Sequence, residues 1–386
     1  MISEKKVTDY WFKIEPYVHI SITDNCVLFY NTLDGVYIES DKIKAIELIK
    51  KTLHKTNYGV ILLTSEQYQQ KDINNLINEL RNKYMADLID VDLSKGKPIQ
   101  ILPLFNLYNI QELFKKHNFS SSKNILEYLS EVSIYVDHKS NITDLISFLK
   151  SLPIVSSINI IGNLDFIVNQ IELLSFLRQL PSSKNIICSY ANISSLRSNL
   201  NNNFSYQLSV NFPVDVQQLN YSNQIRLNQA LSFEYIFEVS SLDDYQEAEN
   251  FVEQYQIEKY QLKPKYNKKN INFFKTNIFL TKEDILSIPM SINDFFANKS
   301  INIYDFGKIS ITSNGNIYAN IYHPSLGNIQ THSIYEIISK EIQEGKSWFR
   351  IRNQDPCSSC IYQWHCPSPS NFEIMIGQPN LCHVKL

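Results

Sequence analysis

Four of the six cysteines lie in the last thirty residues, at the spacing of metal ligands. Cys357 and Cys360 form a C-x₂-C pair, Cys366 follows after five intervening residues, and Cys382 completes the set. Four converging thiolates hold either a tetrahedral zinc ion or a cubane iron–sulfur cluster. The spacing therefore predicts one metal centre, and the alternative is a set of four unrelated buried thiols.

The residues around these cysteines have other predicted roles. His365 and His383 each neighbour a cysteine, and we expect them to lie beside the ligands or at the surface rather than to replace one. Cys26 and Cys188 sit on apolar runs and are predicted to be buried structural thiols. Three aromatic side chains flank the site and are expected to shield it from solvent: Trp348, Phe349 and Trp364.

Composition bounds the class of protein. A chain of 386 residues predicts two or three domains. A net charge of −3 gives no basis for nucleic-acid binding, and the nine glycines form no phosphate-binding loop motif. The first residues lack the order of a signal peptide, and no apolar run reaches the roughly 18 residues of a membrane span. The sequence therefore predicts a cytoplasmic protein with no membrane or nucleic-acid partner. In that reducing compartment, clustered cysteines favour metal over disulfides.

Residues 1–95 have the pattern of one small domain. The runs YVHISI, VLFYNT and GVYIES predict three strands, and Asp34-Gly35 is a hairpin signal between the last two. Apolar residues at three-four spacing predict one helix from about Ser40 and another over 72–84. GVILLTSEQY between them fits a short helix or a strand. A three-stranded meander followed by helices is a winged-helix-like arrangement.

Residues 96–299 alternate short apolar runs with helical patterns. Strands are predicted at PIQILPLF, VSIYVD, INIIG, NIICSY, YQLSVNF, EYIFEVS and YQLKPKY, and most are followed by an amphipathic segment. This rhythm predicts parallel β/α units in a partial barrel, with a doubly wound sheet as the alternative. The lysine- and asparagine-rich segment 264–277 is expected to be an exposed loop. Residues 300–386 predict a hairpin at Asn314-Gly315, a short helix and the cysteine region.

The cysteine pattern resembles a known domain. C-x₂-C-x₅-C with a distant last cysteine resembles the auxiliary-cluster half of a SPASM domain, the C-terminal extension of radical SAM enzymes that modify peptides. The stretch ITSNGNIYANIYHPSLGNIQTHSIYEIIS resembles the hairpin and helix that precede it. A first auxiliary cluster of that family would need a cysteine in the stretch where this chain has Ala319, Asn320 and Tyr322, and Ser370 stands where the family usually has another. The resemblance implies one [4Fe-4S] cluster on the four cysteines, with a structural zinc ion as the alternative.

The catalytic motif of that family is absent from the sequence. Its C-x₃-C-x₂-C loop would follow PIQILPLF, where this chain has NLYNIQELFKK, and no cysteine lies between Val27 and Ile187. The glycine-rich S-adenosylmethionine-binding stretch is matched only by IIGNLDF at 160–166. Through its ending, WFRIRNQDPCSSCIYQWHCPSPSNFEIMIGQPNLCHVK, the chain resembles the pseudo-radical SAM proteins of Bacteroidales-like ribosomal peptide (RiPP) maturation systems. The resemblance implies a radical-SAM-like partial (β/α)6 barrel over 96–299 with no functional S-adenosylmethionine site, and a SPASM-like domain over 300–386.

The order of elements in residues 1–95 resembles the precursor-recognition element of ribosomal peptide maturases. In those proteins a leader peptide adds a strand to a sheet edge and lies in a groove beside the last helix. Carried over by position, the groove would be formed by Val36, Tyr37, Ile38, Glu39, Ile73, Leu76 and Leu80. The alternative is a structural winged-helix domain that binds no peptide.

These observations lead to one main hypothesis of function. The chain is predicted to be a non-catalytic accessory protein that binds a precursor leader, an active radical SAM/SPASM maturase, or both. The first alternative is an iron–sulfur electron-transfer subunit for such a partner. The second is an enzyme of another chemistry at the strand ends, for example at Asp137-His138, although no nucleophile–base pair stands out in the sequence.

Overall fold

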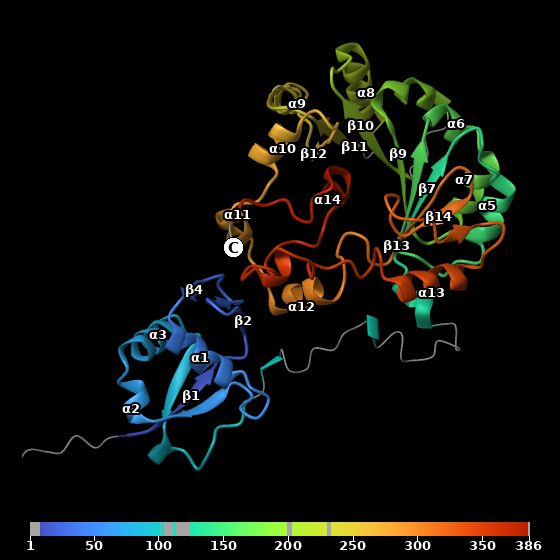
Figure 1. The fold of residues 1–386 in the computed structure, drawn as a ribbon. Coiled ribbons are helices and arrows are strands. Elements are labelled where there is room, and N and C mark those ends of the chain that lie inside the picture. The colour runs from blue at the N-terminus through green and yellow to red at the C-terminus, as the bar shows by residue number, and fades with distance from the viewer. Residues whose placement is uncertain are drawn as a thin grey trace, which may run out of the picture.

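The computed structural model describes residues 8–100, 102–103, 111–112, 124–198, 203–229 and 233–384. It is a mixed α/β structure with two three-stranded sheets in an N-terminal unit and one nine-stranded sheet in the rest of the chain. Figure 1 shows the N-terminal unit to one side of the large sheet, with C-terminal segments between them. None of the helices in these ranges is both long and apolar enough to cross a membrane.

The N-terminal unit contains the predicted meander and both predicted helices. Strands β2 (Val18–Ile22), β3 (Val27–Asn31) and β4 (Tyr37–Ser40) pair antiparallel in that order. Helices α1 (Ile43–Thr52) and α3 (Lys71–Asn82) bury their apolar faces in one core with the strands. Their three-four spacing explains this burial, because such residues share one side of a helix.

A second sheet in this unit was not predicted. GVILLTSEQY forms strand β5 (Val60–Leu63) and the short helix α2 (Ser65–Tyr68), which begins with a capping box at Thr64. Strand β1 (Tyr10–Ile14) pairs antiparallel with β5 on one side and with β6 (Ala86–Asp90) on the other. The 3₁₀ turn η1 (Val91–Leu93) follows.

Six parallel strands lie side by side in chain order in the large sheet. They are β7 (Glu131–Val136), β8 (Ser157–Gly162), β9 (Ser183–Ser189), β10 (Ser205–Asn211), β11 (Phe233–Val239) and β12 (Tyr260–Pro264). A doubly wound sheet reverses its strand order at a switch point. The sequential order therefore rules out that alternative.

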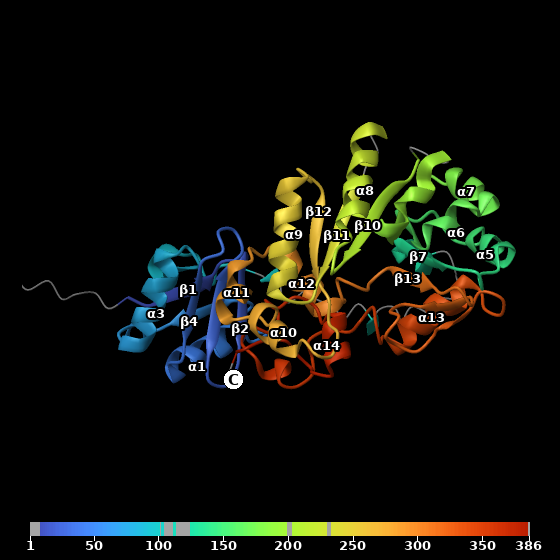
Figure 2. The same cartoon turned by 90° about the horizontal axis from the view of Figure 1, so that it is seen from above.

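A helical segment follows each of the first five of these strands. These segments are α5 (Ile142–Leu149), α6 (Leu164–Val168) with α7 (Ile171–Arg178), η4 (Tyr190–Ser198), α8 (Val216–Gln229) and α9 (Leu242–Gln254). Figures 1 and 2 show the helices along the outer side of the curved sheet. Alternate strand residues, such as Val132, Ile134 and Val136, are buried against them in the main core.

The opposite face of this sheet is polar. Asn159 donates from Nδ2 to Oε1 of Glu131 at 3.1 Å, and Asn185 donates to Oδ1 of Asn159 at 2.9 Å. Further along, Gln207 and Gln261 each donate to Glu234 at 2.7 Å. A ladder of amides and carboxylates thus covers the inner side of the predicted barrel.

The large sheet continues beyond the predicted boundary at residue 300. β13 (Lys308–Ile311) pairs parallel to β7, and β14 (Asn316–Tyr318) and β15 (Gly327–Asn328) follow antiparallel. The hairpin between β13 and β14 contains Gly315 at φ +81°, so the predicted Asn-Gly turn is confirmed. The remaining helical segments are η3 (Asn124–Tyr128), α11 (Lys282–Ser287), α12 (Ile292–Ser300), α13 (Ile334–Glu344), η5 (Cys357–Ser359) and α14 (Asn371–Ile376).

Two sequence-based predictions in the middle of the chain are wrong. The described residues of PIQILPLF (98–100, 102–103) lie in no strand, while 101, 104 and 105 fall outside the described part. Among the described residues, the first strand of the large sheet is β7. Segment 264–277 contains helix α10 (Ile271–Asn277) rather than only loop, because Phe274 is fully buried there.

Candidate metal centre and the neighbouring strand edge

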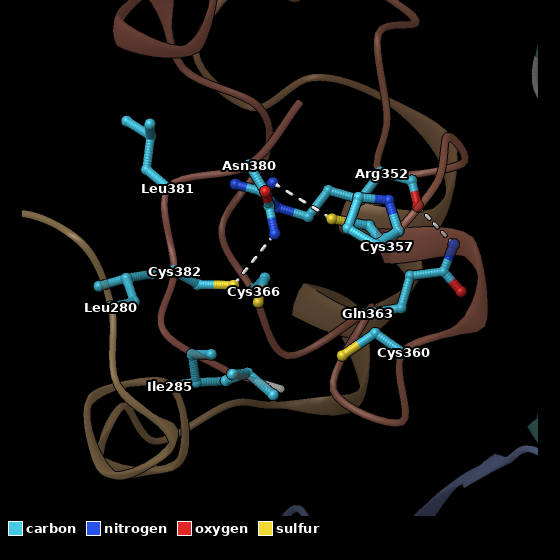
Figure 3. Close-up of a pocket in the computed structure, with 12 residues that line it drawn as sticks. Leu280, Ile285, Arg352, Cys357, Cys360, Gln363, Cys366, Asn380, Leu381 and Cys382 are labelled. Atoms are coloured by element: carbon cyan, nitrogen blue, oxygen red, sulfur yellow. Dashed lines mark hydrogen bonds between the residues drawn. The ribbon is translucent and has the colours of Figure 1, made fainter. Parts of the chain in front are cut away.

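The four predicted ligands line a single cavity. Cys357, Cys360, Cys366 and Cys382 surround about 180 Å³ of space, and Figure 3 shows their sulfur atoms directed towards it. The remaining walls are mainly apolar and include Leu280, Ile285, Leu381 and Val384. Tertiary structure therefore brings Cys382 to the C-x₂-C-x₅-C segment, as the spacing predicts.

Local hydrogen bonds position each ligand. The C-x₂-C pair sits on the turn η5, where the amide of Cys360 donates to the carbonyl of Cys357 at 3.1 Å. The amide of Cys366 donates to the carbonyl of Tyr362, also at 3.1 Å. Cys382 forms an isolated parallel bridge with Leu280, and flanking amide–carbonyl bonds of 2.9 Å hold that bridge in place.

Polar groups approach two of the sulfur atoms. Asn380 Nδ2 donates to Sγ of Cys382 at 3.2 Å, and an Arg352 guanidinium nitrogen lies 3.9 Å from Sγ of Cys357. Arg352 is itself buried and donates to Glu373 Oε1 at 2.9 Å and to the Pro367 carbonyl at 2.6 Å. Such donors stabilise thiolate ligands and orient them. Sequence reasoning missed Arg352, although its place five residues before Cys357 was visible.

Burial favours the neutral form of the thiols in the structure as it stands. Burial raises the pKa of Cys366 to about 12 and raises the pKa values of Cys357 and Cys360 as well. A bound cation reverses this effect because it deprotonates the thiols that coordinate it. Four cysteine side chains lining one cavity are a donor set that zinc and iron–sulfur clusters use.

The size of the cavity bears on which group fits. Four thiolates on one zinc, each about 2.3 Å from it, lie within roughly 4 Å of one another. Within the described part of the chain, no three His, Cys, Asp or Glu side chains come together closely enough for a single ion. The cavity of about 180 Å³ is several times larger than the ~10–15 Å³ that one water molecule needs. The four thiols therefore line a cavity with room for more than a single atom.

The neighbouring histidines and aromatic residues lie outside this cavity. His365 packs against Tyr30, His19 and Phe295, and His383 contacts the Lys275 carbonyl through Nε2 at 2.6 Å. The predicted shielding by aromatic residues is wrong. Trp348 and Phe349 belong to the main core and Trp364 packs near Phe295, while aliphatic side chains line the cavity.

The strand predicted to bind a peptide lies at a sheet edge. Among the described residues, β4 pairs with β3 and with no other strand, and it also contacts α3. The amide of Asn31 donates to the Val36 carbonyl, so Val36 faces β3 and the next residue, Tyr37, directs its amide and carbonyl to the open edge. Lys83 Nζ donates to the Tyr37 carbonyl at 3.1 Å, which confirms that direction.

The residues predicted for the peptide groove divide into two groups. Val36 and Tyr37 are 37% and 39% exposed at the edge, and Glu39 is half-buried. The other four are buried in the core of the N-terminal unit, at most 6% exposed, so their side chains are not accessible to a peptide. They are Ile38, Ile73, Leu76 and Leu80. Peptide binding at this edge stays a prediction.

The other predicted positions have structural explanations. The Asp137 carboxylate accepts the Lys139 amide at 2.7 Å, and this bond lowers its pKa, while His138 is exposed. Within IIGNLDF, Gly162 ends β8 where a Cβ atom would stand 2.3 Å from the Val136 carbonyl. Glycine is required there by the close approach of β7 and β8. The two cysteines outside the cluster differ in burial. Cys188 is buried as predicted, at 4% exposed, whereas Cys26 is only half-buried.

Comparison with known proteins gives little guidance. No protein-family model and no curated protein sequence matches the chain. Two solved structures, one of E. coli MccB with MccA and one of the Microcin C7 biosynthetic enzyme MccB in complex with N-formylated MccA, are each 14% identical with a TM-score of 0.19. They match over 60% and 58% of this chain and 72% and 67% of theirs. A heterocyclase in complex with substrate and cofactor is 10% identical with a TM-score of 0.14, over 60% of this chain and 23% of its own. Similarities of this size carry no argument about fold or function.

Proposed function

We propose that this chain is an accessory protein of ribosomal peptide maturation, which binds a precursor leader at the open edge of β4. The observation that carries the proposal is the edge itself. β4 ends a three-stranded meander, contacts α3, and directs the main-chain groups of Tyr37 outward. An extended peptide can add a strand to such an edge through main-chain hydrogen bonds.

The same edge has an apolar neighbourhood suited to leader side chains. Val36 and Tyr37 are partly exposed beside it, and Tyr84 at the end of α3 is 76% exposed. In this structure the Lys83 ammonium group donates a hydrogen bond to the Tyr37 carbonyl at the edge. Lysine side chains commonly protect an unpaired strand edge in this way. A peptide strand would displace the ammonium group and replace its hydrogen bond.

The sheet of sequential β/α units and the cysteine centre support a descent from the radical SAM/SPASM architecture. On this proposal Cys357, Cys360, Cys366 and Cys382 hold one [4Fe-4S] cluster, and Arg352 and Asn380 donate to its sulfur ligands. The cavity of about 180 Å³ has room for a cluster, and a structural zinc ion is the alternative. Its function here is structural, because the sequence lacks the C-x₃-C-x₂-C motif that would bind the catalytic cluster. An active radical SAM/SPASM maturase is the partner to which the bound precursor is delivered.

The test is a co-expression pull-down with the products of neighbouring genes, combined with metal analysis of the purified protein. The expected result is capture of a precursor peptide through its leader, with or without a maturase. Association with neither would contradict the proposal, and so would cleavage of S-adenosylmethionine by the reconstituted protein.

Two variants locate the binding edge. Tyr37→Pro removes the outward amide, whereas Tyr37→Ala keeps it and removes only the side chain. Both are compared with the wild-type chain after thermal unfolding has established that they fold. Loss of the leader by the proline variant alone identifies main-chain recognition at β4, and equal binding by both variants argues against it.

A further inference from the structure

We infer that the four-cysteine centre controls the docking of β4, so that the proposed peptide edge is held in place only while the centre is loaded. The inference rests on the function proposed above and adds a means of regulating it. It starts from Glu39, which lies on β4 and is bonded to two residues of the C-terminal part of the chain.

Glu39 joins the two parts of the molecule through both carboxylate oxygens. Lys282 Nζ donates to Oε2 at 2.7 Å, and the Tyr362 hydroxyl donates to Oε1 at 2.9 Å. Lys282 Nζ also lies 5.5 Å from the centre of the Tyr362 ring. The three groups thus form one closed polar contact between β4 and the cysteine region.

Both donors are placed by segments that carry metal ligands. Tyr362 lies between Cys360 and Cys366, and its carbonyl accepts the Cys366 amide. Lys282 begins α11 two residues after Leu280, which forms the bridge to Cys382. Movement of the ligand segments therefore moves both donors that hold Glu39.

An apolar contact reinforces this link. Leu28 pairs with Glu39 across β3 and β4 and is fully buried. It packs in one cluster with Ile285, Leu286, Tyr362 and the ligand Cys366. A metal ligand and the strand next to the peptide edge therefore share the same packing cluster.

The ligand segments have little regular structure to hold them without a metal. η5 has three residues and α14 has six, and Cys382 is joined to the rest by a single β-bridge. Short elements of this kind fold together with the metal they bind. Loss of the metal is therefore expected to loosen Tyr362 and Lys282, and with them the docking of β4.

The experiment compares two samples of the full chain purified without oxygen. One is reconstituted with ferrous iron and sulfide, and the other is stripped with a chelator. Hydrogen–deuterium exchange is measured over residues 37–40, and small-angle scattering reports the separation of the two parts. We expect exchange at β4 to become about tenfold faster after stripping, together with a larger radius of gyration.

Substitutions at Glu39 and Tyr362 test whether their contact, rather than a general loss of folding, controls exchange at β4. Glu39→Gln removes the charge and one of the two acceptor oxygens, and Tyr362→Phe removes the hydroxyl donor, while neither replaces a ligand. Both variants are expected to raise β4 exchange while iron content stays at the wild-type level. Asp24→Asn, which removes the exposed pair with Lys50 in the same unit, is the control and leaves exchange unchanged.

Two results would overturn the inference. One is unchanged β4 exchange after metal removal, and the other is unchanged exchange in loaded Glu39→Gln. Neither depends on leader binding, which is measured by the pull-down, so failure of this link and failure of the proposed function are distinguishable.

Discussion

The imidazole of His19 stacks on the ring of Phe295, with centroids 3.7 Å apart and 12° between the planes. His19 lies on β2 of the N-terminal unit and Phe295 on α12, so this stack crosses the junction between the two parts of the chain. His365 and Tyr30 meet the same ring edge-on at 4.7 and 5.6 Å. Burial lowers the pKa of His365 to about 4 and that of His19 as well, so both imidazoles are neutral at pH 7.

Phe295 is therefore predicted to stabilise the junction. Phe295→Ala removes a fully buried ring and is expected to cost about 3–5 kcal/mol. Because the lost contacts lie between the two parts, calorimetry should show the N-terminal unit unfolding separately and at a lower temperature. The control is Phe274→Ala, which removes a buried ring from the C-terminal part. A single shifted transition in both variants would contradict the special position of Phe295.

The six cysteines are expected to differ in how their replacement by serine affects the amount of bound metal. Serine at Cys357, Cys360, Cys366 or Cys382 is expected to lower bound metal to a small fraction of the wild-type value, because each supplies one thiolate to the same cavity. Cys26→Ser, which does not line that cavity, keeps the full content. Metal and acid-labile sulfide analysis of anaerobically purified protein measures both. Zinc without sulfide would replace the cluster assignment with a structural zinc site.

Replacement of Lys83 is expected to strengthen binding of the leader peptide. Its ammonium group bonds the Tyr37 carbonyl at the open edge, and a leader strand has to displace it. Lys83→Met is expected to lower the dissociation constant of a leader peptide recovered in the pull-down by about three- to tenfold, the equivalent of one hydrogen bond. Lys50→Met, whose partner is Asp24, is the control for loss of one positive charge. Fluorescence polarisation with labelled peptide measures the change, and weaker binding by Lys83→Met would count against strand addition.

Glu341 predicts a pH dependence of stability. Its buried carboxylate accepts the amides of Ser347 and Trp348, and burial raises its pKa to about 7. Because the folded pKa lies above the unfolded value, the stabilising contribution is full below about pH 4.5 and is lost as the pH rises through 7. Over that window the wild type is expected to lose roughly 3 kcal/mol relative to Glu341→Gln.

Denaturant unfolding at pH 5, 6.5 and 8 measures this difference. Glu344→Gln, on the same helix but paired with Lys346 near the surface, is the comparison and should leave the pH dependence of the wild type intact. If the free energy of unfolding changed with pH in the same way in the wild type and in Glu341→Gln, Glu341 would stay ionised in the folded protein.

Local patterns in the sequence were sufficient for most of the elements. Short strand-like runs separated by turn residues predicted β2, β3 and β4, three-four spacing predicted α1 and α3, and Asn314-Gly315 predicted a hairpin. These signals work because a strand or helix repeats its side-chain direction over a few residues. The polar inner face of the large sheet had the same kind of signal, since Gln207 and Ser209 alternate with buried residues in β10.

The sequence by itself determined the four cysteines and the absence of a catalytic triplet, because spacing and residue type are properties of the chain. Only the tertiary structure decided what depends on contacts between distant residues. It placed β1 between β5 and β6, buried Ile73 and Leu76 beneath the edge, and joined Glu39 to Tyr362 across 323 positions. Such contacts have no local period, since they form only when separately folded segments pack together.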